Sequence, residues 1–324
     1  LCAAVAVIPL VYLVARAADA GAAAFVETLL RERVGRLTLN TVALTAAVTA
    51  TCFVIGTLVG AGLARVRLPG GRLWILLAAL PLAVPSYLAA FGWLVLTPGL
   101  NGFGAAWMVM SAVCVPYVVL PVVAASRSAS GDLEAVARTL GRSPFGAFRV
   151  ATWPQIRPAA TAGALLVALY TLSDFGAVSM LRFQTLTWGI KAAYGASFDR
   201  LQAALLALVL VLLTLLLVVT ERRARGHLPG SASRAVQRAR ERSRWAPALI
   251  VLLLASPVLG VLIPLLGMGE QLLSAESIHA VDWPRLMGAV GTTLTLAVLG
   301  SVAAVGVSIP IAVLAARFRG RTVG

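Results

Sequence analysis

The chain has 324 residues, of which 60% are hydrophobic and 12% are charged, whereas soluble domains carry about 25% charged residues. This composition excludes a soluble globular protein and predicts a membrane protein. The net charge of +15 would suit a nucleic-acid partner, but the arginines gather in a few loops between apolar runs. Basic loops on the cytoplasmic side of membrane spans explain this pattern better, so no nucleic-acid partner is expected.

Eight apolar runs predict eight membrane spans, since about 20 apolar residues cross the hydrocarbon core. In chain order they are 1–15, 40–64, 73–96, 104–125, 159–181, 201–220, 246–266 and 288–315. The first run is already under way at Leu1, so we expect the chain to be an excerpt with a clipped first helix. The predicted fold class is all-α, a polytopic helical membrane protein.

The positions of the arginines predict the orientation of these spans. Arginine clusters follow the second, fourth, sixth and eighth spans, whereas the loops after odd-numbered spans are more mixed in charge. Because basic loops stay in the cytoplasm, loops 126–158 and 221–245 are predicted to be cytoplasmic. Loops 182–200 and 267–287 are predicted to lie outside.

Prolines interrupt the third and fourth spans, and one carboxylate lies in the fifth. Helices interrupted by proline tend to line a cavity, because the freed carbonyls need protein or water donors. Simple packing kinks are the alternative for these prolines. An unpaired carboxylate is costly in a span, so Asp174 either faces a passage or accepts hydrogen bonds from another helix or a loop.

The longest polar interruption, residues 126–158, predicts a pair of short helices. Asp132 is the expected N-cap of the first helix, and Gly141 can take the left-handed conformation that ends it. Ser143 before Pro144 is typical of an N-cap with proline at the first helical position.

The second helix of this pair is expected to end at Pro154 and Pro158. Phe145, Phe148 and Thr152 would lie on one of its faces. A unit of this size with two exposed phenylalanines cannot bury much against itself. It is therefore predicted to present an apolar ridge to a groove on a partner protein.

One segment of the sequence is repeated, with one copy before and one copy after a basic linker at 221–245. Residues 40–65 parallel residues 292–317 at an offset of 252, because both segments open on a polar-Thr-aliphatic group and close on Ala-Arg. Internal symmetry of this kind is usual in transporters built from two halves. We expect a first half at 1–220 and the start of a second, truncated half at 246–324.

The spacing in the polar loop resembles the EAA loop of binding-protein-dependent ABC transporter permeases. Ala135-Val136-Ala137 is followed by Gly141 and, thirteen residues later, by Pro154. Ala135 stands where the family pattern has Glu, and Glu134, one residue earlier, is the candidate to replace that acid. The resemblance implies a loop that contacts an ATPase, through Glu134, Ala135, Ala137, Gly141, Phe145, Phe148 and Pro154.

Three further stretches resemble the ferric-iron branch of these permeases, in which two halves are fused in one chain. They are Pro81–Tyr87, Leu172–Ser179 and Ser197–Arg200. The resemblance implies a type I ABC importer permease-like fold and a passage for ferric iron. Residues implied to border that passage are Pro81, Pro85, Tyr87, Ser173 and Asp174. Fused thiamine permeases have a similar architecture, so thiamine or another small solute remains an alternative.

This resemblance also implies the partners and the location. A cytoplasmic ABC ATPase dimer would bind ATP and magnesium, and a periplasmic or lipid-anchored solute-binding protein would deliver the solute. The permease itself would bind no cofactor, contact membrane lipid, and lie as a multi-pass protein in the bacterial cytoplasmic (inner) membrane.

Two other function classes fit the residues less well. An ion-coupled secondary transporter usually has several carboxylates in its spans, and only Asp174 qualifies here. The single lysine, Lys191, is not part of a phosphate-binding loop, and the two histidines lie on opposite sides of the predicted topology. No catalytic residue and no metal site is therefore expected, and the chain is predicted not to be an enzyme.

Overall fold

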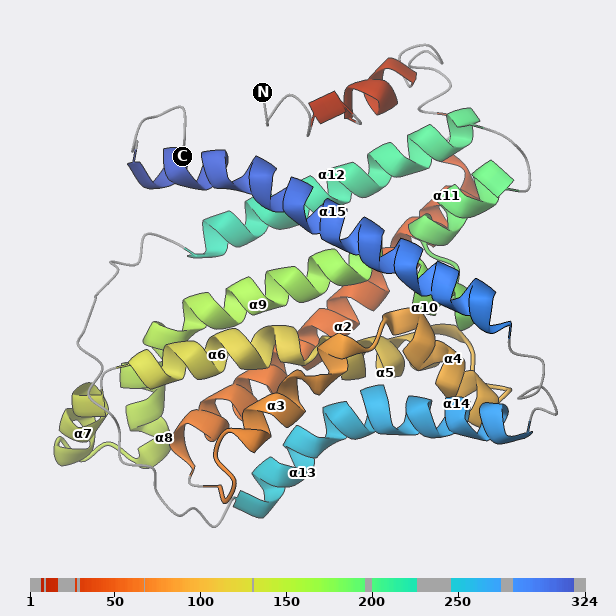
Figure 1. Ribbon diagram of the computed structural model, residues 1–324. Coiled ribbons are helices and arrows are strands. Elements are labelled where there is room, and N and C mark those ends of the chain that lie inside the picture. Colours follow the sequence, from red (N-terminus) through yellow and green to blue (C-terminus); the bar gives the residue numbers. More distant parts are fainter. Residues whose placement is uncertain are drawn as a thin grey trace. The chain divides into compact units, whose positions relative to one another are not determined.

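The computed structural model describes residues 7–8, 10–16, 27, 30–66, 68–129, 131–195, 200–225, 246–274 and 282–317 (Figure 1). Within these ranges the elements are helices, and no β-strand is present. The chain divides into two compact units, one of residues 23–270 and one of residues 1–22 with 271–324. Residues 1–6 and 9 of the first predicted span, the stretch 196–199, most of the basic linker and both histidines lie outside the described residues.

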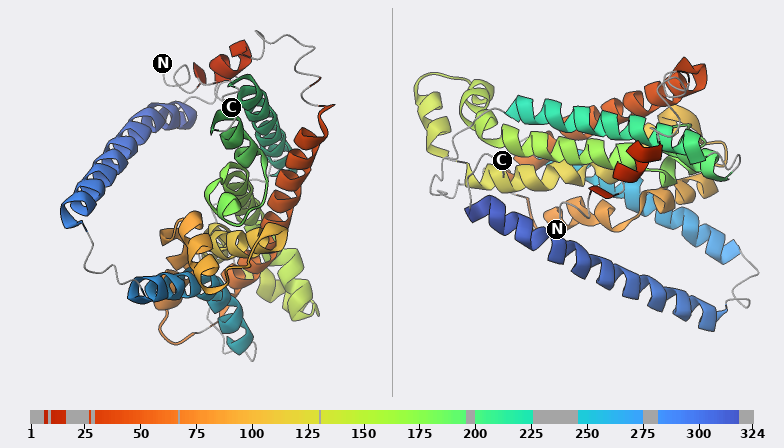
Figure 2. Two further views of the ribbon diagram at one scale, coloured as in Figure 1. Left: turned by 90° about the vertical axis from the view of Figure 1, so that its right-hand side faces the viewer. Right: turned by 90° about the horizontal axis from the view of Figure 1, so that it is seen from above.

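The larger unit contains most of the helices, which are seen from two further sides in Figure 2. In chain order they are α2 (Glu32–Arg65), α3 (Leu73–Ala79), η1 (Leu80–Ala83), α4 (Ser86–Leu96), α5 (Gly102–Cys114), α6 (Pro116–Ser128), α7 (Gly131–Thr139), α8 (Pro144–Ala147), η2 (Phe148–Thr152), α9 (Trp153–Ser173), α10 (Gly176–Met180), α11 (Leu186–Gly195), α12 (Arg200–Arg225), α13 (Ala246–Pro257), η3 (Val258–Leu262) and α14 (Ile263–Ser274). The smaller unit contains α15 (Trp283–Arg317) and the last residues of α14, 271–274.

Six of the described helices are long and apolar enough to cross a membrane. They correspond to six of the eight predicted spans, although α2 begins at Glu32 rather than at residue 40. Two predicted spans need correction. The run 73–96 is not continuous, because it bends by 86° between η1 and α4. The run 159–181 is also divided, because α9 ends at Ser173 and α10 begins only at Gly176.

The broken run results from two prolines that cannot donate helical hydrogen bonds. Pro81 lies in the 3-10 turn η1, and Pro85 is the N-cap of α4 with extended ψ. The two pieces meet different neighbours, since α3 packs on α6 and α13, whereas α4 packs on α5 and α10. The two pieces therefore pack at different positions along the helical span that α5 and α6 form together.

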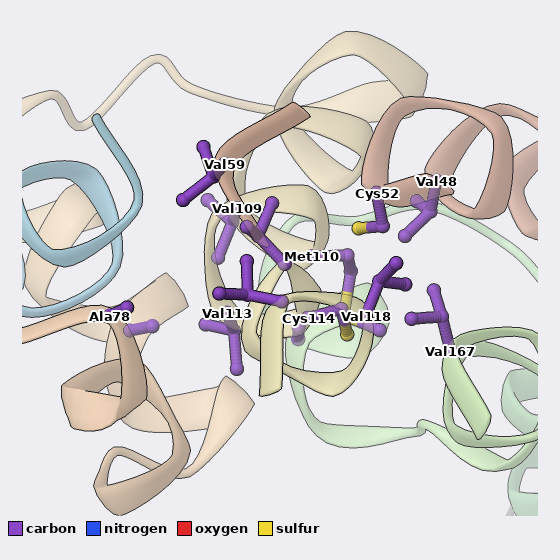
Figure 3. Packing of buried hydrophobic residues seen from close by; sticks show 14 of the residues in the cluster. Val48, Cys52, Val59, Ala78, Val109, Met110, Val113, Cys114, Val118 and Val167 are labelled. Carbon is purple, nitrogen blue, oxygen red and sulfur yellow. The ribbon is translucent and has the colours of Figure 1, made fainter. Parts of the chain in front are cut away.

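The core of the larger unit forms around α2, which packs on α5, α6 and α9. Figure 3 shows Val48 and Cys52 of α2 facing side chains of α5 and Val118 of α6. Two glycines of α2 allow a close approach to α6. A Cβ atom on Gly56 would lie 2.6 Å from the Cβ of Val118, and one on Gly60 would lie 2.8 Å from the Cβ of Val122. Small residues four apart commonly serve this purpose between membrane helices.

Prolines in the helices free backbone carbonyls, and neighbouring helices supply the missing donors. The Ala112 carbonyl would pair with the N–H of residue 116, which is a proline, and it accepts instead from Ser256 Oγ at 2.7 Å. In the π-helical segment η3 the Leu259 carbonyl would pair with residue 264, also a proline. It accepts from Trp93 Nε1 at 2.8 Å. These two bonds fasten α13 and η3 to α5 and α4.

The crossing of α4 and α14 leaves no room for side chains at its centre. A Cβ atom on Gly92 would lie 2.2 Å from the carbonyl oxygen of Pro264, and one on Gly267 would lie 2.1 Å from that of Gly92. Because the obstructing atoms belong to backbone, neither helix can make room without moving as a whole.

We therefore expect Gly92→Ala to destabilise the protein, by about 1–3 kcal/mol for an overpacked site. Gly104→Ala in α5 is the matched control, because nothing lies within 4 Å of its added Cβ. That change should be neutral or slightly stabilising, since alanine favours the helix. Apparent melting temperatures in detergent test this, and equal melting temperatures for both variants would contradict the described crossing.

Candidate functional site: the helix pair α7–α8 and the Asp174 cluster

The first helix of the polar loop, α7, ends in a left-handed glycine as predicted. Gly141 has φ +81°, and two backbone bonds close the turn around it. Gly141 N–H donates to the Arg138 carbonyl at 3.0 Å, and Arg142 N–H donates to the Ala137 carbonyl at 3.1 Å. This is the Schellman arrangement, which satisfies carbonyls at the end of a helix. The N-cap prediction is wrong by position, because α7 begins at Gly131 and Asp132 lies in its first turn.

The second helix of the loop begins as predicted but does not stop where the prolines suggest. Ser143 caps α8 by accepting from Gly146 N–H at 3.2 Å, with Pro144 at the first helical position. The chain then passes through the π-helical segment η2 directly into α9, which has Pro154 in its first turn and Pro158 inside.

An apolar ridge is exposed on the helix pair, but its members differ from those predicted. Phe145 is 74% exposed and belongs to it. Phe148 does not, because it is partly buried against the core and lies under the Arg65 guanidinium. Thr152 is also buried. The α7 side chains Leu133, Val136 and Leu140, spaced as one helical stripe and each more than half exposed, complete what we call the apolar ridge: Leu133, Val136, Leu140 and Phe145.

Glu134 points away from solvent and makes internal contacts. Its Oε2 lies 2.9 Å from Arg65 Nη2 and accepts from Thr152 Oγ1 at 2.6 Å. Ala135, where the EAA pattern has its acid, is exposed and lies about 100° further round the helix. Glu134 is therefore not a surface acid in place of that residue. Ala137 is buried, and the pair α7–α8 lies at one end of α6 and α9 (Figures 1 and 2).

The second group of predicted residues meets at the break between η1 and α4. The Asp174 carboxylate accepts from Ser86 Oγ and from the backbone N–H of Ala177 at 3.0 Å, and its carbonyl accepts from Thr187 Oγ1 at 2.8 Å. We call Ser86, Asp174, Ala177 and Thr187 the Asp174 cluster. The hydrogen bonds of one of the two roles left open for Asp174 are present, since the carboxylate joins α4 to α10 and its carbonyl holds α11. That Asp174 also borders a passage stays a prediction.

The other residues predicted for a passage differ in exposure. Pro81 is buried in η1, whereas Tyr87 on α4 and Ser173 at the end of α9 are exposed. Tyr87 packs so closely on α10 that a Cβ on Gly176 would lie 2.7 Å from the tyrosine Cβ. Sequence reasoning missed Arg65, Thr152 and Thr187 as partners. The Ala-Arg ending of the second span was the signal that could have found Arg65.

Metal-ligating side chains do not gather in the part of the chain that the structure describes. No group of three or more histidine, cysteine, aspartate or glutamate residues there could hold a metal ion. Cys52 and Cys114 are buried as free thiols in the core of the larger unit. The chemistry that these residues offer is therefore hydrogen bonding and packing.

We expect Asp174→Ala to destabilise the protein by about 1–3 kcal/mol, because Ser86 and the start of α10 would lose a partly buried acceptor. Asp174→Asn keeps an acceptor oxygen and should cost clearly less. Asp282→Ala is a matched control, because Asp282 caps the exposed start of α15 by accepting from Arg285 N–H at 3.0 Å. Thermal unfolding in detergent measures the stability of all three variants. An Asp174→Ala variant as stable as wild type would show that the hydrogen bonds of Asp174 do not stabilise the protein.

Comparison with known proteins places the chain among permeases. No family model matches it. The Fe(3+)-transport system permease protein FbpB 2 of Haemophilus influenzae is 36% identical over 214 residues, which are 66% of this chain and 42% of that protein. The sulfate transport system permease protein CysT of Escherichia coli is 28% identical over 187 residues, 51% of this chain and 67% of that protein. The molybdenum transport system permease protein ModB of Mycobacterium tuberculosis is 33% identical over 147 residues, 41% of this chain and 56% of that protein.

The chain spans less than half the length of the ferric-iron permease that it matches. Among solved structures, a chain of the MetNI methionine ABC transporter in inward facing conformations superposes with a TM-score of 0.48 at 21% identity. That match covers 62% of this chain and 96% of the other. The relatives in sequence are all transport permeases, and the described helices include six that could cross a membrane. By sequence the chain is thus similar to the permeases of ABC importers, and its helices are those of a multi-pass inner-membrane protein.

Proposed function

We propose that this chain is part of the transmembrane permease of an ATP-driven, binding-protein-dependent importer for ferric iron. Its α7–α8 pair would dock on a separate cytoplasmic ATPase that binds ATP and magnesium. A solute-binding protein outside would deliver the iron. The observation that carries the proposal is the apolar ridge, which stands on a turn fixed at Gly141 and has no partner within the described residues.

The ridge has the properties of a docking surface. Leu140 and Phe145 are 78% and 74% exposed at the tip of the helix pair, and exposed apolar groups of this kind mark interaction sites on proteins. An amphipathic helix lays such a stripe into a groove on its partner. Arg138, Arg142 and Arg149 are exposed on the same helix pair and the segment that follows it, and they would suit an acidic rim around that groove.

Iron is the favoured solute because of the relatives. The ferric-iron permease matches more of this chain, and at higher identity, than the sulfate and molybdenum permeases do. The absence of a metal cluster among the described residues does not argue against iron, because a permease offers a passage while a separate protein holds the ion. Sulfate, molybdate and thiamine are therefore included as competing solutes in the uptake experiment.

Helix bounds support the proposal that the chain contains one permease half and the start of another. Residues 32–65 of α2, shifted by the offset of 252, fall on 284–317, and α15 occupies Trp283–Arg317. The two longest described helices therefore match in length and in sequence position. On this proposal α15 is the copy of α2 in the second half.

The test is uptake by the full-length protein, reconstituted with its ATPase and binding protein in proteoliposomes. We expect ATP-dependent uptake of ferric iron and little uptake of sulfate, molybdate or thiamine. Uptake of one of these solutes instead of iron would refute the iron assignment while leaving the importer class intact. Uptake driven by an ion gradient without ATP would refute the importer class.

The same preparation tests the docking surface. Phe145→Asp should abolish copurification of the ATPase, because a charge would enter the apolar contact, whereas Phe145→Leu should retain most of it. Membrane insertion should be equal for both variants, and the yield of folded protein measures it. Normal ATPase binding by Phe145→Asp would show that the ridge does not dock there.

A further inference from the structure

A well-shielded ion pair joins the helix pair to a membrane helix. Arg65 is the last residue of α2, and Glu134 lies in the first half of α7, with 2.9 Å between Nη2 and Oε2. Their side chains are only 26% and 13% exposed. By contrast, the pairs Arg31–Glu27 and Arg36–Glu32 join residues four apart and are more than half exposed, and such surface pairs contribute little.

Each partner of this pair is held by a second contact, and both contacts come from η2. Thr152 Oγ1 donates to the same Glu134 Oε2 at 2.6 Å, and Thr152 itself is buried. The Arg65 guanidinium lies over the Phe148 ring, 4.5 Å from its centroid, at a distance typical of a cation–π contact. The π-helical η2 is the segment through which α8 continues into α9. Three elements, α2, α7 and the start of α9, therefore meet at one charge pair.

This pair gives α7 a direct link to the membrane helices. Within the larger unit α7 packs on α8 and η2, so its other route to the core runs along the chain into α9. The α2 helix has 34 residues and is about 50 Å long. Near its opposite end Thr41 Oγ1 accepts from Leu186 N–H at 2.9 Å, in the segment that carries Thr187 of the Asp174 cluster. A displacement of α7 is therefore applied to α2 at Arg65, and α2 extends from there to the segment beside the Asp174 cluster.

We propose that Arg65 and Glu134 are positioning residues that transmit movement of the docked helix pair to α2. This inference rests on the proposed function, because it assumes that the ATPase docks on the apolar ridge. The ridge and the ion pair lie on different faces of α7. Breaking the pair should therefore leave ATPase binding intact and reduce the transport obtained from each ATP hydrolysed.

The test uses the full-length protein with its ATPase and binding protein in proteoliposomes. Glu134→Gln and Arg65→Gln each remove one charge, and Asp132→Asn removes an exposed charge from the same helix as a control. Both single variants should copurify the ATPase within about twofold of wild type. Their uptake per ATP should fall by roughly tenfold or more, since one partner of a shielded pair loses its counter-charge. The control should behave as wild type.

A charge exchange, Arg65→Glu with Glu134→Arg, separates transmission from simple damage. It should restore part of the uptake per ATP, though not all, because a carboxylate over the Phe148 ring gains no cation–π contact. Wild-type coupling in both single variants would overturn the proposal. So would an exchange variant no better than the single variants, or a loss of uptake that merely follows a loss of ATPase binding.

Hydrogen exchange in residues 131–142 keeps this test independent of the proposed function. The single variants should exchange faster there than wild type and Asp132→Asn, and the exchange variant should recover protection. If the wild-type protein binds no ATPase, the proposed function fails, while protection still reports whether the pair positions α7. Unchanged protection in both single variants would show that it does not.

Discussion

A backbone carbonyl buried in a membrane must find a donor, and this requirement determines how the larger unit is assembled. Prolines remove the helical donors of Ala112 and Leu259, and Ser256 and Trp93 of neighbouring helices replace them. Since unsatisfied polar groups are costly in hydrocarbon, these replacements fix which helices lie side by side. The prolines therefore interrupt helical hydrogen bonding and also create the free carbonyls through which neighbouring helices are hydrogen-bonded to one another.

Charged groups follow the same rule at both ends of the unit. Asp174 is held by a hydroxyl and the start of α10, and Glu134 by Arg65 and Thr152. Neither carboxylate is left to face lipid. The result is a set of helices packed around α2 with an apolar ridge exposed at one end. On the proposed function, a force applied at the ridge would reach α2 through the contact between Glu134 and Arg65.

The sequence was sufficient for local features and insufficient for those that depend on partners far along the chain. The turn at Gly141 and the cap at Ser143 were predictable, because a short motif determines each. The burial of Phe148 was not, since it depends on Arg65, more than eighty residues earlier. The break at Pro85 was visible as a pair of prolines, but hydropathy alone suggested one continuous span. Hydrogen bonding was foreseen as one of two roles for Asp174, but its partners Ser86 and Thr187 come from other helices and could not be named from the sequence.

The central claim is that the ridge side of α7 meets the ATPase while the Glu134 side meets α2. Cysteine cross-linking in membranes that contain the full complex tests this most directly, with single cysteines at Leu140 and at Glu134 in a background without the native cysteines. The account predicts a cross-link to the ATPase from position 140 and none from position 134, which should instead link to a cysteine at Arg65. An ATPase cross-link from position 134 but not from 140 would contradict it.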